Sequence, residues 1–520
     1  MKKKVINLFS VFFILFLQGS IDAQELKSKT LILLLSIFTL VSCKTSEVLI
    51  PLENGLIIEN ARIISPENQT LSSESYIVIN GDDIVYTGLD KPNLKGSFET
   101  IDAKGKYIIP GLIDSHVHIT GTGALSDKEE LENPEVVKSF RNQLPKSYLY
   151  FGYTTLIDLG TEKPRRLSEF NKAEIKPDLY FVGGGAVIGN GYGMSNWNDE
   201  IPNFIYQENE NYPIPKKFKK ENHTPKVVAK RIANSGAIAI KTYYEPGFDP
   251  TQPPFPTPSL ALMGELKREA HKNNLILVVH GNSLEAHNFL GNAKVDIIAH
   301  GLWNWGNYRL NSNNRIPEEI KKALDLEIEN NIGYMPTLQV INGLKALTNS
   351  EFLDNPELQN VLPKQLIDYY KSNADVMYAN VFGDAPKHII SKNFNRLSNQ
   401  GKINLKYLND NGGKILFGTD TPSSPTYGNP PGYNGYIEML EMDSAGIPLS
   451  KILAMATIEN AKAFKLEKLY GTVEKGKKAN LLILNKNPLI DITAYNDISQ
   501  VIIQGKLINR SMLSAKEIEE

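Results

Sequence analysis

Residues 108–119 read IIPGLIDSHVHI, an apolar run that ends with His116 and His118 on either side of one valine. Alternate side chains of a β-strand point to the same face, so these two imidazoles would project together, about 6 to 7 Å apart along the strand. They could then converge on one metal ion. The alternative is a polar pair on a solvent-facing strand edge, and residues elsewhere in the chain must decide between the two.

Apolar runs of this kind recur along the central part of the chain. They cover residues 112–118, 154–158, 179–184, 237–241, 275–280, 295–300, 333–338 and 415–420. Amphipathic stretches such as PSLALMGELKREAHKNN, residues 258–274, lie between them, a pattern typical of parallel strands buried on both faces. Eight such units predict an α/β fold of the (β/α)8 TIM-like barrel type, with its active site at the C-terminal ends of the strands.

The two ends of the chain have a different pattern. Short β-like runs such as SYIVING, residues 75–81, are separated by turn residues, and QVIIQGKLINR, residues 500–510, is similar. We expect a small β-sandwich built from both chain ends, with residues 43–107 as its N-terminal part. The barrel would cover residues 108–440, and residues 441–520 would supply a C-terminal helix and the remaining sandwich strands.

The predicted barrel strands end in residues that suit a metal site. Besides His116 and His118, these are Lys241, His280, His300 and Asp420. Imidazoles combined with a carboxylate suit Zn²⁺ and similar divalent ions. A lysine that reacts with CO₂ becomes a carbamate, which resembles a carboxylate and can bridge two metal ions. For Lys241 the alternative is a structural cation, and for any single histidine it is a hydrogen-bonded core position.

The chain resembles the amidohydrolase superfamily, in the branch similar to imidazolonepropionase and to the metal-dependent Xaa-Pro dipeptidases. The matching stretches follow the family's order between residues 108 and 508 and include IIPGLIDSHVH, YFGYTTLIDLG, AIAIKTYYE, LILVVHG, DIIAHGL and ILFGTDTP. One loop departs from the family pattern: VGGGAVIGNGYGM, residues 182–194, does not match the stretch expected after the third strand.

The resemblance implies a role for each strand-end residue. It implies that His116 and His118 bind one metal ion, that His280 and His300 bind another, and that a carboxylated Lys241 bridges them. Two Zn²⁺ ions per chain are the expected content, with Asp420 both touching metal and acting in catalysis. Tyr243 resembles a tyrosine that meets the substrate carbonyl in the dipeptidase-like members, and a packing aromatic is the alternative.

These residues predict a hydrolase that cleaves an amide C–N bond in a dipeptide or a cyclic amide. A bound divalent ion lowers the pKa of water to about 7 and so supplies hydroxide, and Asp420 would act as general base and acid. Three alternatives stay open. They are another carbonyl or phosphoester substrate at the same site, a mononuclear deaminase-like enzyme in which Lys241 has no metal role, and a non-catalytic surface-binding lipoprotein.

The N-terminal region predicts export. Residues 1–42 contain two apolar runs preceded by lysines, in the order of secretory signals. The second run ends in LVSC, which resembles a bacterial lipobox and predicts lipidation of Cys43, the only cysteine of the chain. We therefore expect a membrane-anchored lipoprotein on the periplasmic or cell-surface side. The balance of 56 basic and 58 acidic residues gives no reason to expect nucleic acid, so the expected partner is a small-molecule substrate, with a homo-oligomer left open.

Overall fold

The structure is a computed structural model that describes residues 49–160, 164–194, 203–209, 211, 213–248, 251–310, 315–422 and 425–516. Contacts between residues divide the chain into one unit of residues 1–51 and 92–95 and another of residues 52–91 and 96–520. The predicted signal region 1–42 and the predicted lipidation site Cys43 lie outside the described residues. Among the described helices, none is both long enough and apolar enough to cross a membrane.

The second unit contains all eight predicted barrel strands, and all are parallel. β6 (Leu112–Val117), β7 (Tyr153–Asp158) and β8 (Asp178–Phe181) form one hydrogen-bonded sheet. A second sheet has the order β13-β12-β11-β10-β9, and its strands are β9 (Ala239–Tyr243), β10 (Ile276–His280), β11 (Ile297–Ala299), β12 (Gly333–Met335) and β13 (Lys414–Ile415). Strand order along the chain is therefore preserved around the barrel.

Individual backbone hydrogen bonds join the two sheets at both seams. At one seam, the amide of Ile238 donates to the carbonyl of Phe181 at 3.1 Å. At the other seam, the amide of Ser115 donates to the carbonyl of Phe417 at 3.3 Å, and Val117 and Thr421 form a parallel bridge. The predicted (β/α)8 architecture is thus confirmed, with each sheet continuing into the other through these contacts.

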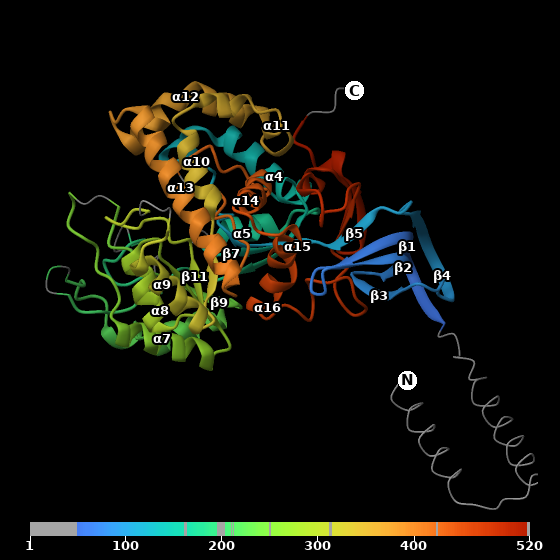
Figure 1. Cartoon of the computed structure of the whole chain (residues 1–520), viewed down its shortest axis with the longest axis horizontal. Helices are drawn as coiled ribbons and strands as arrows, with labels where there is room; N and C mark the ends of the chain where they lie inside the picture. The colour runs from blue at the N-terminus through green and yellow to red at the C-terminus, as the bar shows by residue number, and fades with distance from the viewer. Residues whose placement is uncertain are drawn as a thin grey trace, which may run out of the picture. The chain divides into compact units, whose positions relative to one another are not determined.

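Helices cover the outer face of the strands. α6 (Pro225–Asn234), α7 (Leu260–Lys272), α8 (Leu284–Ala293) and α9 (Glu318–Glu329) pack in sequence order beside the second sheet, and Figure 1 shows α7, α8 and α9 grouped on one side of it. Serine starts two of them, because Ser259 accepts from the amide of Leu262 and Ser283 from the amide of Ala286. All residues of β10 are buried, and each fully buried Leu, Ile or Val side chain stabilises the fold by roughly 1.5–3 kcal/mol.

The long segment between the seventh and eighth strands is helical. It contains α10 (Leu338–Ala346), α11 (Leu358–Val361), α12 (Lys364–Phe382) and α13 (Lys387–Asp410). α10 packs against α13 and α14 (Tyr433–Ser444), and α12 packs against α4 (Pro134–Tyr150). The other described α-helices are α3 (Asp127–Glu132), α5 (Pro164–Asn171), α15 (Leu449–Ala454) and α16 (Asn460–Ala463), and the π-helix η3 (Met455–Glu459) joins the last two.

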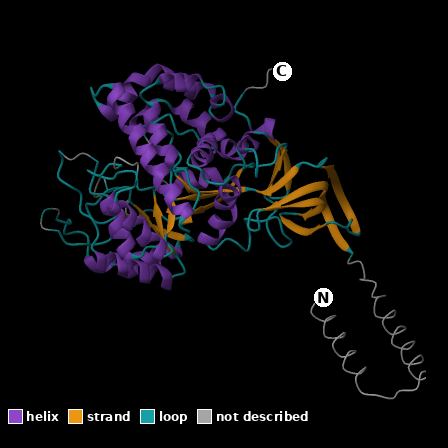
Figure 2. Cartoon of the chain, viewed as in Figure 1, coloured by secondary structure: helices purple, strands orange, loops and turns teal. Residues whose placement is uncertain are grey.

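Both chain ends contribute to one flanking sheet, as the sequence predicts. Figure 2 shows the strands of this sheet in orange. Its order is β16-β15-β14-β5-β1-β2-β3, with β4 also paired to β1. The two ends meet where β5 (Tyr107–Pro110) pairs antiparallel with β14 (Leu481–Leu484). The remaining strands are β1 (Ile50–Ser65), β2 (Thr70–Asn80), β3 (Asp83–Gly88), β4 (Leu94–Asp102), β15 (Ile498–Ile503) and β16 (Lys506–Asn509).

One buried side chain spans a barrel seam, and its removal is expected to destabilise the fold. The Asn460 amide group donates to the carbonyls of Ile113 at 2.9 Å and Phe417 at 2.7 Å, and its oxygen accepts from the Phe417 amide at 3.1 Å. Asn460→Ala leaves these buried groups unpaired, so the free energy of unfolding should fall by about 2–4 kcal/mol. Urea denaturation measures the loss. The matched control is Asn292→Ala on α8, where the side chain is exposed, and equal midpoints for both variants would contradict the prediction.

Candidate metal centre

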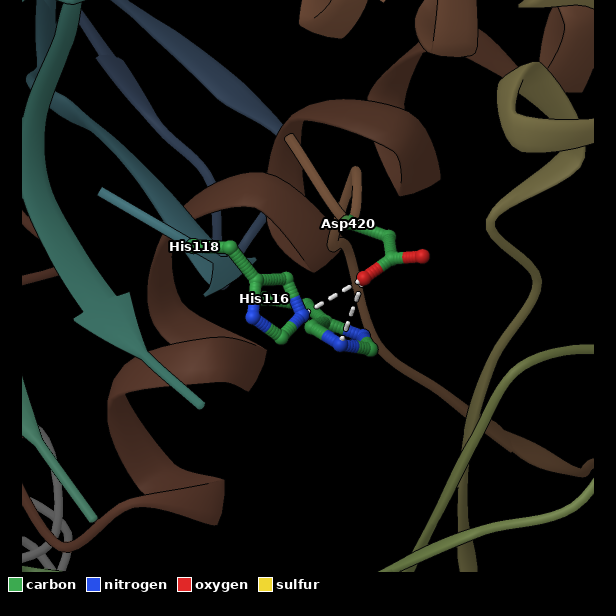
Figure 3. A group of neighbouring side chains, drawn as sticks. All are labelled: His116, His118 and Asp420. Carbon is green, nitrogen blue, oxygen red and sulfur yellow. Dashed lines mark ion pairs between the residues drawn. The ribbon is translucent and has the colours of Figure 1, made fainter. Parts of the chain in front are cut away.

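His116, His118 and Asp420 meet at the C-terminal ends of β6 and β13. His116 lies within β6, His118 follows that strand, and Asp420 lies in the segment after β13. One ligand atom from each of the three lies within 4.8 Å of the others. Asp420 Oδ1 is 2.7 Å from His118 Nε2 and 3.1 Å from His116 Nε2 (Figure 3). The strand alternation therefore does bring both imidazoles to one carboxylate oxygen.

The two other strand-end histidines lie next to this triad. The ring centroids of His116 and His300 are 4.9 Å apart, and those of His300 and His280 are 4.6 Å apart. His280 is the last residue of β10, while His300 follows the last residue of β11. All four imidazoles thus form one continuous group, with His116 and His300 in its middle.

Lys241 is buried beneath this group. It lies inside β9 rather than at the end of the strand, and its side chain is 1% exposed. Its Nζ has no hydrogen-bond partner among the described residues and lies 5.6 Å from the centroid of the Tyr243 ring. Burial lowers the pKa of Lys241 to about 7, although Asp420 acts in the opposite direction. The amine forms no ion pair with an Asp or Glu among the described residues, so they do not support the alternative of a structural cation.

The electrostatics keep three of the histidines neutral. Burial lowers the pKa of His116 to about 3, and it also lowers the pKa values of His280 and His300. Burial also acts to lower the pKa of His118, but the hydrogen bond and negative charge of Asp420, together with the charge of Asp158, raise this pKa overall. Burial raises the pKa of Asp420, yet the neighbouring imidazoles of His116 and His118 hold it well below its usual range. Neutral imidazoles beside a charged carboxylate are the donor set that binds divalent metal ions.

Several residues that sequence reasoning did not single out orient the imidazoles. His300 Nδ1 lies 3.1 Å from Thr337 Oγ1, and His280 Nε2 lies 3.3 Å from Glu245 Oε2. Asp158 Oδ2 accepts from the amide of Ile119, directly after His118, at 2.9 Å. Asp158 ends β7, so its strand-end position could have identified it. Such partners fix the ring orientation of metal-binding histidines.

Aromatic residues of the segments that follow the barrel strands divide into two groups. Tyr243 lies beside the site, with its ring centroid 5.7 Å from that of His280, and Trp303 lies 5.4 Å from His300. Trp305 and Tyr427 are buried, 0% and 2% exposed, and belong to the main hydrophobic core. For these two residues, packing between segments is the observed role.

Comparisons with known proteins identify the family of the chain. Residues 107–508 match the model of the amidohydrolase family. A stretch of 137 residues is 28% identical to L-hydantoinase of Paenarthrobacter aurescens and covers 26% of this chain and 28% of that protein. A stretch of 64 residues is 45% identical to dihydroorotase of Wolbachia sp. subsp. Drosophila simulans strain wRi and covers 12% of this chain and 14% of that protein.

The chain thus spans less than a third of the length of the curated relatives that it matches first. Similarity of fold extends further. The crystal structure of a Xaa-Pro dipeptidase with bound methionine in its active site is similar over 88% of this chain and 100% of that chain, with a TM-score of 0.59 and 20% identity. At this level of identity, the likeness establishes the common fold.

Proposed function

Because the chain belongs to the amidohydrolase family, as its sequence motifs predict, we propose that it is a metal-dependent hydrolase of small amides. The bond cleaved is an amide C–N bond in a dipeptide or a cyclic amide. The observation that carries this proposal is the group of four imidazoles, one amine and one carboxylate at one end of the barrel, in which all but the partly exposed His118 are buried. The names of the similar proteins, a hydantoinase, a dihydroorotase and a Xaa-Pro dipeptidase, support both substrate types.

The residues present fit a pair of divalent ions such as Zn²⁺. His116 Nδ1 and the amine of Lys241 are buried without a hydrogen-bond partner among the described residues, which is costly unless a ligand satisfies them. His116, His118 and Asp420 would hold one ion, and His280 and His300 the other. Lys241 would bridge them after its neutral amine has added to CO₂ and lost a proton to form a carbamate.

The chain's own residues then divide the work of hydrolysis. Bound in this site, a divalent ion supplies a water with a pKa near 7 and polarises the carbonyl under attack. Asp420 would accept the proton of the attacking water as its oxygen bonds to the carbonyl carbon, and would return that proton to the nitrogen as the C–N bond breaks. Tyr243, beside His280, holds the substrate carbonyl. With the imidazoles of His116, His280 and His300 holding the ions, their lone pairs would be occupied, which leaves Asp420 as the base.

A panel of small amides tests the proposed function. Purified protein loaded with Zn²⁺ is incubated with dipeptides, including Xaa-Pro dipeptides, and with hydantoin and dihydroorotate as cyclic amides, and release of product is followed by chromatography. We expect turnover of at least one class, loss of turnover on chelation and its return when metal is added back. Protein that contains two metal ions per chain but hydrolyses none of these amides would overturn the proposal.

Thr337→Val is expected to weaken metal binding. It removes the hydroxyl beside His300 Nδ1 while keeping the shape of the side chain, and loss of such a partner typically costs 10- to 100-fold in metal affinity. Competition with a chromophoric chelator measures the affinity. Thr337→Ser keeps the hydroxyl and should restore most of the affinity, and Thr348→Val, at a hydroxyl that bonds only within its own turn, serves as the control. Equal affinities for the Val and Ser variants would refute this role of Thr337.

A further inference from the structure

Four aromatic rings lie side by side next to His280, and we call them the aromatic wall. They belong to Tyr192, Tyr243, Phe248 and Phe255. Tyr192 is the centre of the wall, because its ring centroid lies 5.7 Å from Tyr243, 5.7 Å from Phe248 and 6.3 Å from Phe255. Tyr192 comes from the loop after β8 that departs from the family pattern, and the two phenylalanines come from the Pro-rich segment after β9.

The wall is continuous with the candidate metal centre. The ring of Tyr192 stacks on that of His280 at a centroid distance of 5.4 Å and an interplanar angle of 28°. Tyr243 contacts the same imidazole at 5.7 Å. A group held against the wall would therefore lie next to a residue of the proposed catalytic site, within reach of the end of β10.

The two phenylalanines of the wall are more exposed to solvent than is usual for large apolar side chains. Phe248 is 66% exposed and Phe255 is 44% exposed, although aromatic side chains of this size normally gain stability from burial. A backbone hydrogen bond closes the loop that carries both phenylalanines, because the amide of Phe255 donates to the carbonyl of Pro246 at 2.9 Å. Gly247, within this loop, adopts a φ of 115°. Exposed apolar side chains that are grouped and held beside a functional site mark a binding surface.

Resting on the proposed function, we infer that the aromatic wall binds an aromatic side chain of the amide substrate. The rings of Tyr243, Phe248 and Phe255 stand at 61°, 89° and 68° to Tyr192. They therefore offer both faces and edges, and an added aromatic ring is attracted to either through stacked or edge-to-face contact. The substrate class is thus a small amide that carries a phenyl-like group near its scissile bond.

A cation is the other ligand that aromatic rings attract, and the charges next to the wall disfavour it. Glu245 is the carboxylate at the start of the same loop, and it is 5% exposed. Its Oε1 accepts from the amide of Gly247 at 2.8 Å, and its Oε2 lies 3.3 Å from His280 Nε2 and 3.5 Å from Asn282 Nδ2. This carboxylate is buried and already contacts three donors, so it is not exposed at the wall to pair with a bound ammonium group.

Paired substrates test the inference through activity. kcat/KM is measured for dipeptides with Phe, Leu, Lys or Ala at either position, and for 5-benzylhydantoin against 5-methylhydantoin. We expect the wild type to prefer the aromatic member of each productive pair by about 10-fold or more. The double variant Phe248→Ala, Phe255→Ala should lose most of that preference. Phe98→Ala, at an exposed phenylalanine of β4 in the flanking sheet, should retain it.

A binding measurement separates failure of the inference from failure of the proposed function. The affinities of N-acetylphenylalanine, N-acetylalanine and N-acetyllysine for the metal-loaded protein are compared by calorimetry in the same variants. Suppose that no amide is hydrolysed, but that N-acetylphenylalanine binds more tightly than N-acetylalanine and loses this advantage when Phe248 and Phe255 are replaced. The proposed function is then wrong, and the inference that the aromatic wall binds an aromatic group is retained. Equal binding of the phenylalanine and alanine compounds, or tighter binding of the lysine compound, overturns the aromatic class whatever the activity.

Discussion

Asp420→Asn is expected to lower kcat by roughly 100- to 10,000-fold, because it removes the group that accepts the proton of the attacking water. The carboxylate is well placed for this step, since Oδ1 lies within 3.1 Å of both His116 Nε2 and His118 Nε2 and the side chain is 12% exposed. Its pKa is raised by burial but held well below the usual range by the two imidazoles, so it is a charged base at neutral pH. Steady-state kinetics with the best amide of the panel measures the loss.

Two companion measurements make the Asp420 result specific. Metal content by atomic emission should show that the variant still contains metal, because four imidazoles remain in the site. Asp296→Asn makes the same chemical change at a carboxylate that lies 2.8 Å from His271 Nε2 outside this site, and it should keep near-normal turnover. Near-normal turnover of the Asp420 variant with metal bound would remove Asp420 from the role of base.

The barrel was predictable because its strands are buried on both faces. Buried strands require continuous apolar runs, and all eight runs became strands. The ends of the strands were less predictable. The run 415–420 forms a strand only at Lys414–Ile415, and both His300 and Asp420 have a positive φ, of 89° and 60°, which is not a strand conformation. The spacing of apolar residues does not predict such a local backbone change, because the side chains can be buried with either a strand conformation or a positive φ at these two positions.

The side chains of the site were predictable as a set because parallel strands bring their C-terminal ends to one mouth. Their supporting partners were not. Thr337 contacts His300, and Glu245 contacts His280, in each case from a different strand or loop. Neither Thr337 nor Glu245 lies in a sequence pattern that distinguishes it from ordinary loop residues. Tyr192 likewise reaches His280 from a loop without regular periodicity. Contacts of this kind depend on how each loop folds over the barrel, which residue spacing alone does not encode.

Lys241→Met is expected to abolish turnover and to release metal. The side chain is 1% exposed, and its amine has no hydrogen-bond partner among the described residues, so the amine contributes nothing to stability that would explain its burial. If its role is to bridge two metal ions as a carbamate, the bound metal should fall from two ions per chain to one or none. Methionine fills a similar volume without a charge, so the barrel should stay folded. Metal analysis and circular dichroism measure the two quantities.

If Lys241 forms a carbamate, the rate at which the apoprotein takes up metal should depend on CO₂ and on pH. Only the neutral amine reacts with CO₂, and burial lowers the pKa of Lys241 to about 7, so the reactive fraction in metal-free protein should rise as the pH increases through 7. Metal uptake by apoprotein should accordingly be slow in CO₂-depleted buffer at pH 6 and be accelerated by bicarbonate at pH 8. Isotopically labelled bicarbonate would place a carbonyl signal on the wild type and none on Lys241→Met. Full occupancy by two ions in the Met variant, or metal uptake indifferent to bicarbonate, would show that Lys241 serves the site without forming a carbamate.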